Sequence, residues 1–115
     1  MPEKPLFWVG GVRDDLRAFS DDARRRAGFE LHLVQRGLTP SDWKPMPEVG
    51  PGVMEIRIRS GEEHRIFYIA KYDEAVYVLH AFQKKSQKTP KREIELGRTR
   101  LAQVVSERAS QRNTR

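Results

Sequence analysis

The side chains best suited to chemistry in this sequence are cations on three neighbouring segments. Arg57 and Arg59 alternate with apolar residues in the first segment, and Arg65 belongs to the next. Lys84 and Lys85 follow the third, a run of β-branched and aromatic residues. A guanidinium group can bind a phosphate through two hydrogen bonds, and a lysine acts as a point charge. If the three segments are adjacent strands, these cations lie on one side of a sheet and form a phosphate-binding site.

Carboxylates in the same segments offer a second explanation for the arginines. Glu55, Glu62 and Glu63 could pair with Arg57 and Arg59 as solvated cross-strand partners. That explanation suits a single arginine on a strand better than four or five converging cations with no matching acids nearby. Phosphate binding and cross-strand pairing therefore both stay open from the residues alone.

Charge is distributed unevenly along the 115 residues, whose net charge is +6. Residues 1–83 contain 12 Lys and Arg against 13 Asp and Glu, whereas residues 84–115 contain 10 against 3. This asymmetry indicates a polyanionic partner for the last third of the chain, although a basic tail can also serve solubility alone. A membrane-surface helix is disfavoured because the sequence beyond Val105 is polar on all sides and has no aromatic anchor.

Other kinds of site find little support in the composition. The absence of cysteine rules out disulfides and thiolate metal sites, and it fits a cytoplasmic location. The histidines at 32, 64 and 80 form no cluster with metal-ligand spacing, and no nucleotide-binding glycine loop or nucleophilic triad is present. No apolar run reaches the roughly 18 residues that a membrane span needs. We therefore expect no cofactor, no metal and no membrane association.

A few more side chains near the cations could take part in such a site, His80 as a catalytic group and the others as phosphate or base contacts. His80 precedes the lysine pair by four residues, although a lone histidine on a strand is usually packed or hydrogen-bonded. Tyr68 is close to Arg65 in sequence and could hold a phosphate or stack on an unpaired base, although aromatic residues on strands are usually core. Lys88 and Lys91 extend the basic cluster.

Periodicity and turn residues predict the elements that position these side chains. Strands are expected over residues 5–9, 53–59, 63–72 and 75–82, and helices over 12–19, over 22–34 and after Thr89-Pro90. The second helix should bury a stripe widened by Phe29, and Gly37 should end it. Residues 38–52 read as a loop that Trp43 and Met46 attach to the core.

The expected fold class is α+β. An antiparallel β-meander would be accompanied by two N-terminal helices and one C-terminal helix. The third strand, apolar on both faces, would be central or well covered. The chain is long enough for one hydrophobic core. We expect a single domain over residues 1–107 and a basic, disordered tail over 108–115.

Three segments carry a resemblance to a known family. They are 52–57 (GVMEIR), 65–68 (RIFY) and 78–90 (VLHAFQKKSQKTP). Together with the order of the expected elements, they resemble the phage-derived, HigB-like branch of the RelE toxin superfamily over about residues 5–105. The run from Lys84-Lys85 to Thr89-Pro90 is the most specific part of the match.

The resemblance implies a toxin of a type II toxin–antitoxin system, a ribosome-dependent mRNA endonuclease (mRNA interferase) that cleaves mRNA in the ribosomal A site. The implied partners are mRNA, the ribosome and a small helix-turn-helix antitoxin. Such enzymes cleave RNA by attack of the 2′-hydroxyl on the neighbouring phosphate, without a metal.

The resemblance also implies roles for individual residues. Arg65 would stabilise the pentacovalent phosphate, Arg57 would position the backbone, and Lys84 or Lys85 would assist proton transfer or neutralise the leaving group. The expected RNA contacts are Arg59, Tyr68, His80, Lys88 and Lys91. Some relatives use a C-terminal tyrosine or histidine, but here no tyrosine follows residue 77 and no histidine follows residue 80, so the general acid and base stay open. The alternative is a non-catalytic RNA- or DNA-binding module with the same fold.

Overall fold

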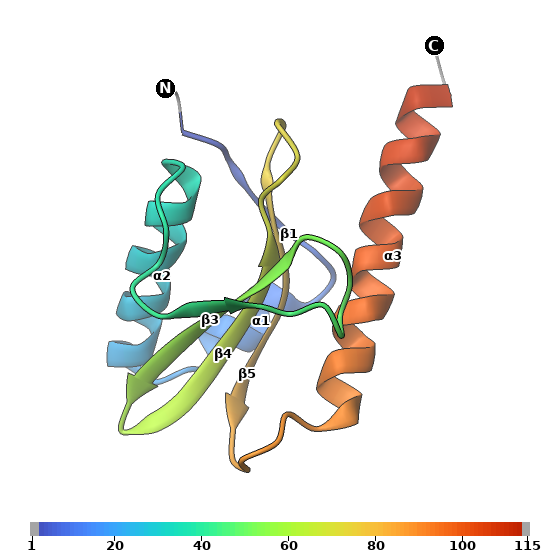
Figure 1. Ribbon diagram of the computed structural model, residues 1–115. Coiled ribbons are helices and arrows are strands. Elements are labelled where there is room, and N and C mark those ends of the chain that lie inside the picture. Colours follow the sequence, from blue (N-terminus) through green and yellow to red (C-terminus); the bar gives the residue numbers. More distant parts are fainter. Residues whose placement is uncertain (1–2, 114–115) are drawn as a thin grey trace.

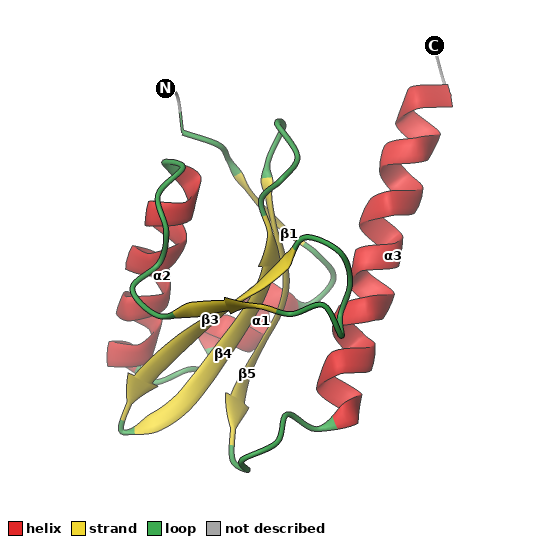
Figure 2. Cartoon of the chain, in the orientation of Figure 1, coloured by secondary structure: helices red, strands yellow, loops and turns green. Residues whose placement is uncertain are grey.

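Five strands form one mixed sheet in a computed structural model that describes residues 3–113 (Figures 1 and 2). The strand order is β1-β5-β4-β3-β2. The elements in chain order are β1 (Leu6–Trp8), α1 (Val12–Arg17), α2 (Asp21–Gln35), β2 (Trp43–Pro45), β3 (Val53–Ser60), β4 (Glu62–Ile69), β5 (Val76–Lys84) and α3 (Lys91–Asn113). The predicted α+β class, with two helices before the meander and one after it, is confirmed.

The β3–β4–β5 meander is antiparallel, as predicted. Gly61, with a φ of +71°, forms the turn between β3 and β4, a backbone conformation that residues with a side chain rarely adopt. β1 was expected as a strand, but it pairs with β5 in the parallel direction, so the sheet is mixed. β5 thus lies between β1 and β4 as a central strand, and its residues 76–82 are all buried.

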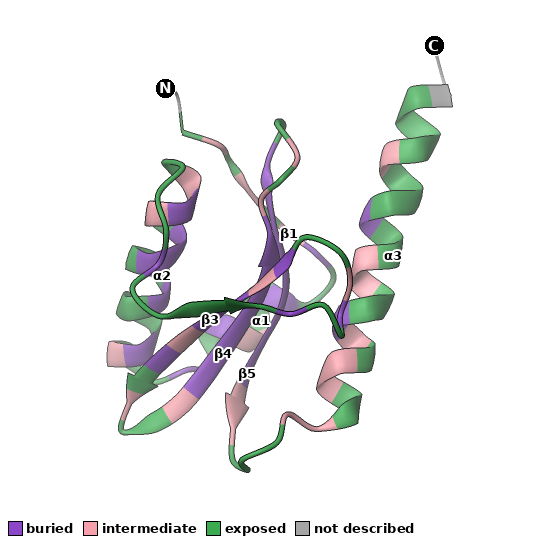
Figure 3. Ribbon diagram, in the orientation of Figure 1, coloured by how far each residue is buried: buried purple, intermediate pink, exposed green. Residues whose placement is uncertain are grey.

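Helices pack on both faces of the sheet (Figure 1). One face carries Ile56, Ile66 and Val78 and forms a core with α1 and α2, whose contributions include Leu16 and Leu31. The other face forms a second core that α3 helps to close; its buried members include Val53, Phe67, Ile69, Leu79, Phe82 and Val104. Buried residues concentrate along β4, β5 and the sheet-facing side of α2 (Figure 3). Each fully buried large aliphatic side chain contributes about 1.5–3 kcal/mol relative to exposure.

α2 begins and ends where the sequence predicts. The Ser20 side chain accepts a hydrogen bond from the Ala23 N–H at 3.3 Å, which satisfies one of the free amides of the first turn. Gly37 follows the helix with a φ of +79°. The prediction for Phe29 is wrong: its side chain is 60% exposed. Two residues along a helix rotate by about 200°, so Phe29 points away from the buried Ala27 rather than widening its stripe.

β2 lies within the segment that the sequence predicts as a loop. It pairs with β3 through Trp43, Lys44 and Pro45, and all three residues are exposed because β2 is the edge strand. Met46 is buried as predicted, but Trp43 is 40% exposed and does not attach the segment to the core.

α3 starts at Lys91, since the Pro90 carbonyl accepts the first helical hydrogen bonds, and it continues to Asn113. The tail predicted to be disordered from residue 108 is therefore helical through 113, and 114–115 lie outside the described residues. The added turns are held by Arg108, whose Nε donates to Glu74 Oε2 at 2.6 Å and whose guanidinium lies 3.8 Å from the Tyr72 ring centre. Within residues 3–113, no helix combines the length and apolarity needed to cross a membrane.

Candidate nucleic-acid interface

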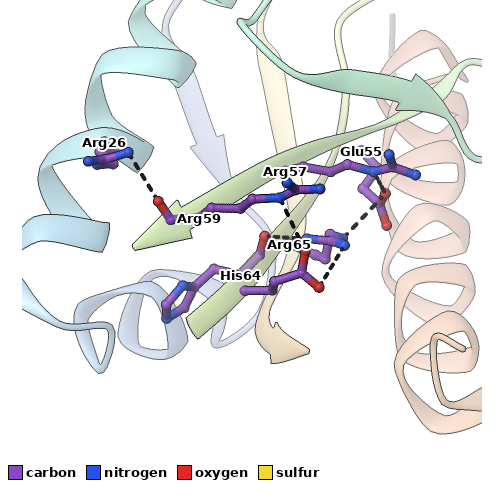
Figure 4. Close-up of polar contacts among 7 residues, drawn as sticks. Arg26, Glu55, Arg57, Arg59, His64 and Arg65 are labelled. Atoms are coloured by element: carbon purple, nitrogen blue, oxygen red, sulfur yellow. Dashed lines mark hydrogen bonds and ion pairs between the residues drawn. The ribbon is translucent and has the colours of Figure 1, made fainter. Parts of the chain in front are cut away.

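Strand alternation places four cations on the sheet face that also carries Phe67 and Phe82. Arg57 pairs with Arg65 across β3 and β4, and residues opposite each other in an antiparallel pair share a face. Arg59 of β3 and Lys84 of β5 both lie opposite Glu63 of β4, so they lie on the same face as Arg57 and Arg65. We call Arg57, Arg59, Arg65 and Lys84 the arginine face. Figure 4 shows its three arginines side by side over β3 and β4, with His64 pointing away.

One buried carboxylate joins two of these arginines. Oε1 of Glu55 lies 3.2 Å from Nε of Arg57 and 3.6 Å from Nε of Arg65. The Glu55 side chain is only 1% exposed. A buried charge is tolerated when a charge of opposite sign lies beside it. The expectation that the cations have no matching acids nearby is therefore wrong.

A second carboxylate, Glu63, lies between two arginines at the surface. Its Oε1 is 3.3 Å from Nε of Arg59, and its Oε2 is 3.5 Å from Nη2 of Arg65. The Glu63 side chain is 41% exposed, so solvent reaches this pair. Arg65 also donates from Nη1 to the His64 carbonyl at 3.2 Å. Glu63 thus occupies the position between two guanidinium groups that a phosphate could occupy.

The arginine face keeps an excess of positive charge after these pairs are counted. It has four cations and two carboxylates, Glu55 and Glu63. The exposed fractions of the arginine side chains are 74% for Arg59, 31% for Arg57 and 5% for Arg65. Arg59 and Arg57 are accessible to a ligand, whereas Arg65 forms the floor beneath them.

A basic turn follows β5 and extends this region. Lys84 is half-buried at the end of the strand, whereas Lys85, Lys88 and Lys91 are exposed. The Ser86 hydroxyl donates to the Lys88 carbonyl at 2.7 Å and closes the turn. The turn and the β3–β4 hairpin lie at the same end of the molecule (Figure 1). The structure therefore brings both groups of predicted cations to one end of the sheet.

The family described as phage derived protein Gp49-like (DUF891) matches residues 14–102. The chain belongs to this family. The match runs from α1 into α3 and includes both the arginine face and the basic turn. The Gp49-like family is toxin-like and related to RelE proteins, and the observed fold is consistent with a RelE-like domain. A search among curated proteins finds no significant match.

His80 of this Gp49-like protein is held beneath α3 rather than presented to solvent. Its Nε2 lies 2.9 Å from Oε1 of Glu93, and Nη1 of Arg100 lies 3.3 Å from its Nδ1. A carboxylate can only accept and a guanidinium can only donate, so these contacts fit a neutral ring that carries its proton on Nε2. Burial lowers the pKa of His80, partly opposed by Glu93. Its side chain is 5% exposed, which leaves little surface for an RNA contact.

Tyr68 lies on the opposite face of the sheet from the arginine face. It belongs to the core formed with α1 and α2, and the whole residue is 4% exposed. Burial raises the pKa of its phenol to about 12. The expected proximity of the phenol to Arg65 is therefore wrong, and Tyr68 is not placed to stack on a base bound at the arginine face.

Glu55 and Glu63 were expected only as partners of Arg57 and Arg59; their contacts with Arg65 and the role of a neighbouring aromatic side chain were not predicted. Glu55 and Glu63 occupy the same alternating positions as the arginines, a signal that was present in the sequence. The exposed Phe29 lines a groove beside β3 together with Arg25 and Arg26 of α2. Among residues 3–113, no group of three or more histidine or carboxylate side chains is arranged to hold a metal ion.

Proposed function

We propose that this Gp49-like protein is the toxin of a type II toxin–antitoxin pair, of the HigB-like branch, and that it cleaves mRNA on the ribosome. The observation that carries the proposal is the arginine face, where Arg57 and Arg65 share Glu55 Oε1 and Lys84 lies at the end of the adjacent strand. Several guanidinium groups that lie close together can stabilise the additional negative charge of a pentacovalent phosphate. The proposed partners are mRNA in the ribosomal A site and a small helix-turn-helix antitoxin, in the cytoplasm.

In the proposed reaction, the 2′-hydroxyl of one nucleotide attacks the adjacent phosphate. The bond between O2′ and phosphorus forms and the bond to O5′ breaks, which leaves a 2′,3′-cyclic phosphate and a 5′-hydroxyl. The 2′-hydroxyl loses its proton to a base, and O5′ gains one. The ammonium group of Lys84 or Lys85 can supply the proton to O5′, or neutralise its charge as it leaves.

The exposed fractions of the arginines suggest how the phosphate is bound. Arg59 and Arg57 would contact it first, since they are the accessible guanidinium groups. A phosphate oxygen that displaces the Glu63 carboxylate from between Arg59 and Arg65 would then gain both donors at once. In this scheme Arg65 acts from the floor of the face, and Arg57 and Lys84 act from its surface.

The proposal is tested by mapping RNA ends after the purified protein is added to translating ribosomes. The wild type should cut the mRNA in the A site, and the Arg57→Ala/Lys84→Ala double variant should lose at least about 100-fold in rate, since one oxyanion donor alone is worth about that much. Arg13→Ala is the matched control, because Arg13 is an exposed arginine on α1. Uncut mRNA with the wild type would refute the nuclease assignment.

A second candidate function is a non-catalytic RNA- or DNA-binding module. The observation that favours it is the near burial of Arg65, with 5% of its side chain exposed. Such a module would bind ribosomes or nucleic acid with strong salt dependence, and the arginine-face variants would lose binding while no cleavage appeared with any variant. Cleavage by the wild type excludes this candidate.

A further inference from the structure

We propose that the groove between α2 and the outer edge of β3 binds one unpaired nucleotide of an RNA strand that crosses the arginine face, with its base stacked on Phe29. This inference rests on the proposed function in taking RNA as the ligand. It adds a base-binding position that lies outside the arginine face.

Phe29 is unusually accessible for a large apolar side chain. It is 60% exposed, which exceeds the exposure of every other large hydrophobic residue among 3–113; Leu38 and Val105 follow at 50%. A single exposed apolar residue is common on protein surfaces and by itself indicates no site. The surroundings of Phe29 therefore decide its interpretation.

Phe29 lines a groove with a volume of about 520 Å³. Arg25 and Arg26 precede Phe29 by four and three residues on α2, so both lie on the same side of the helix. Arg57 and Arg59 line the groove from β3. Arg25 and Arg26 lie beside one accessible aromatic ring, and the two β3 arginines of the arginine face border the groove. Cations next to a stacking surface are the combination that binds single-stranded nucleic acid.

The acids of this groove are partly occupied by the protein itself. Asp22 accepts from the Ser60 hydroxyl at 2.5 Å and from Arg26 at 3.0 Å, and these contacts lower its pKa. Glu30 is buried and accepts from the Ser41 N–H at 2.9 Å. Asp42 is exposed; its backbone carbonyl, not its carboxylate, accepts from the Arg57 N–H at 2.9 Å and connects this segment to β3.

The groove adjoins the arginine face because β2 covers only part of β3. β2 pairs with residues 54–56, so β3 from Arg57 onward forms the outer edge of the sheet. Arg26 donates to the Arg59 carbonyl at 3.0 Å, which places α2 directly beside this edge (Figure 4). Arg57 and Arg59 belong to both regions. An RNA strand bound at the face therefore reaches Phe29 by passing over the edge of β3.

The test compares aromatic and aliphatic side chains at position 29 by measuring the affinity for an unstructured RNA of about 12 nucleotides, within the range of single-stranded site sizes. Phe29→Ala and Phe29→Leu should each weaken binding by about 5- to 100-fold, as expected for loss of one stacked base, and Phe29→Tyr should stay within about twofold of the wild type. Phe7→Ala is the matched control, since Phe7 is 47% exposed on β1, at the far side of the sheet.

Single abasic substitutions along the same RNA locate the stacked base. One position should weaken binding to the wild type and leave binding to Phe29→Ala unchanged. Arg25→Ala should lower the slope of log affinity against log salt by about 0.7, the value for one phosphate contact on a single strand. Wild-type affinity in Phe29→Ala would overturn the inference. Full affinity in Phe29→Leu would also overturn it, because the side chain would then serve as an apolar contact, as in protein docking.

The inference and the proposed function can fail separately. If the wild type cuts mRNA on ribosomes and Phe29→Ala binds RNA normally, the nucleotide site is refuted and the nuclease assignment stands. If no cleavage occurs but the aromatic requirement at position 29 holds, the nuclease assignment is refuted and the nucleotide site stands.

Discussion

Arg57 and Arg65 lie opposite each other across β3 and β4, and both guanidinium groups contact the same carboxylate oxygen, Oε1 of Glu55. Like charges directly opposite in a β-ladder repel each other. The buried carboxylate offsets this repulsion and holds the two cations at one place on the sheet. The arginine face is therefore a candidate binding surface that rests on a buried ion pair between Arg65 and Glu55.

Glu55→Gln should destabilise the protein strongly. Removing one partner of a buried ion pair typically costs about 3–5 kcal/mol, because the remaining charge is left without its counterion. Urea unfolding followed by circular dichroism measures the change. Glu48→Gln, at an exposed position, should change stability by no more than about 0.5 kcal/mol. A loss of unfolding free energy below about 1 kcal/mol in Glu55→Gln would show that solvent stabilises the charges of Arg57 and Arg65 without the carboxylate.

Glu63→Gln should bind RNA more tightly than the wild type. Glu63 contacts both Arg59 and Arg65, so its neutralisation removes a competitor for phosphate and raises the local positive charge by one. A gain of a few-fold at low salt is expected, and it should shrink as salt screens the exposed charges. Titration of labelled single-stranded RNA at two salt concentrations measures it. Weaker binding would show that Glu63 positions the arginines instead of masking them.

Much of the candidate site follows from rules that can be applied to the sequence. A tight turn centred on Gly61 is enough to place Arg57 opposite Arg65 and Arg59 opposite Glu63. Strand alternation also excludes Tyr68 from the face that carries Arg65, because the two positions are three residues apart. Placing Tyr68 near Arg65 overlooked that rule. The pairing of Glu55 with Arg57, one of the two explanations for the arginines, also agrees with alternation, and the same rule places Glu55 on the face of Arg65.

Other features depend on contacts between distant segments and could not be predicted from local patterns. The pairing of β2 with β3 joins residues 9 to 13 positions apart across a segment rich in proline and glycine. The burial of His80 depends on Glu93 and Arg100 of α3, and the helical end of α3 depends on Glu74. Helix propensity alone did not predict that end, since tertiary contacts stabilise it.

Gly97 lies where α3 packs tightly against Val49 and Phe67, and this predicts a contrast between two glycine substitutions. A Cβ at Gly97 would lie 3.0 Å from Val49 Cγ1 and 3.1 Å from Phe67 Cδ2, so Gly97→Ala should cost about 1–3 kcal/mol through overpacking. Gly28→Ala is the matched control within α2, where a Cβ meets nothing within 4 Å. It should stabilise the protein by up to about 1 kcal/mol, because alanine favours the helix. Thermal unfolding of the two variants should shift in opposite directions; equal shifts would contradict this packing.

The Glu74–Arg108 pair predicts how acid affects the attachment of α3. The Arg108 guanidinium, with a further hydrogen bond from the Tyr77 hydroxyl, lowers the pKa of Glu74 to about 2 from an ordinary value of 4.5. A lowered folded-state pKa means that the pair stabilises the fold fully above about pH 4.5 and loses that contribution as the pH falls toward 2. The Glu74 side chain is 44% exposed, so solvent screening limits the contribution to about 1 kcal/mol.

Glu74→Gln should therefore be less stable than the wild type by a constant amount above about pH 4.5, and the difference should shrink toward pH 2. Urea unfolding of both proteins across this range measures it, and taking the difference between them cancels the titration of the other carboxylates. Glu107→Gln, an exposed carboxylate on the same helix, should track the wild type at every pH. Faster amide hydrogen exchange in residues 105–112 of Glu74→Gln at neutral pH would show that the lost stability belongs to the last turns of α3. A difference between wild type and Glu74→Gln that stays constant down to pH 2 would show that the charge of Glu74 contributes nothing to holding α3.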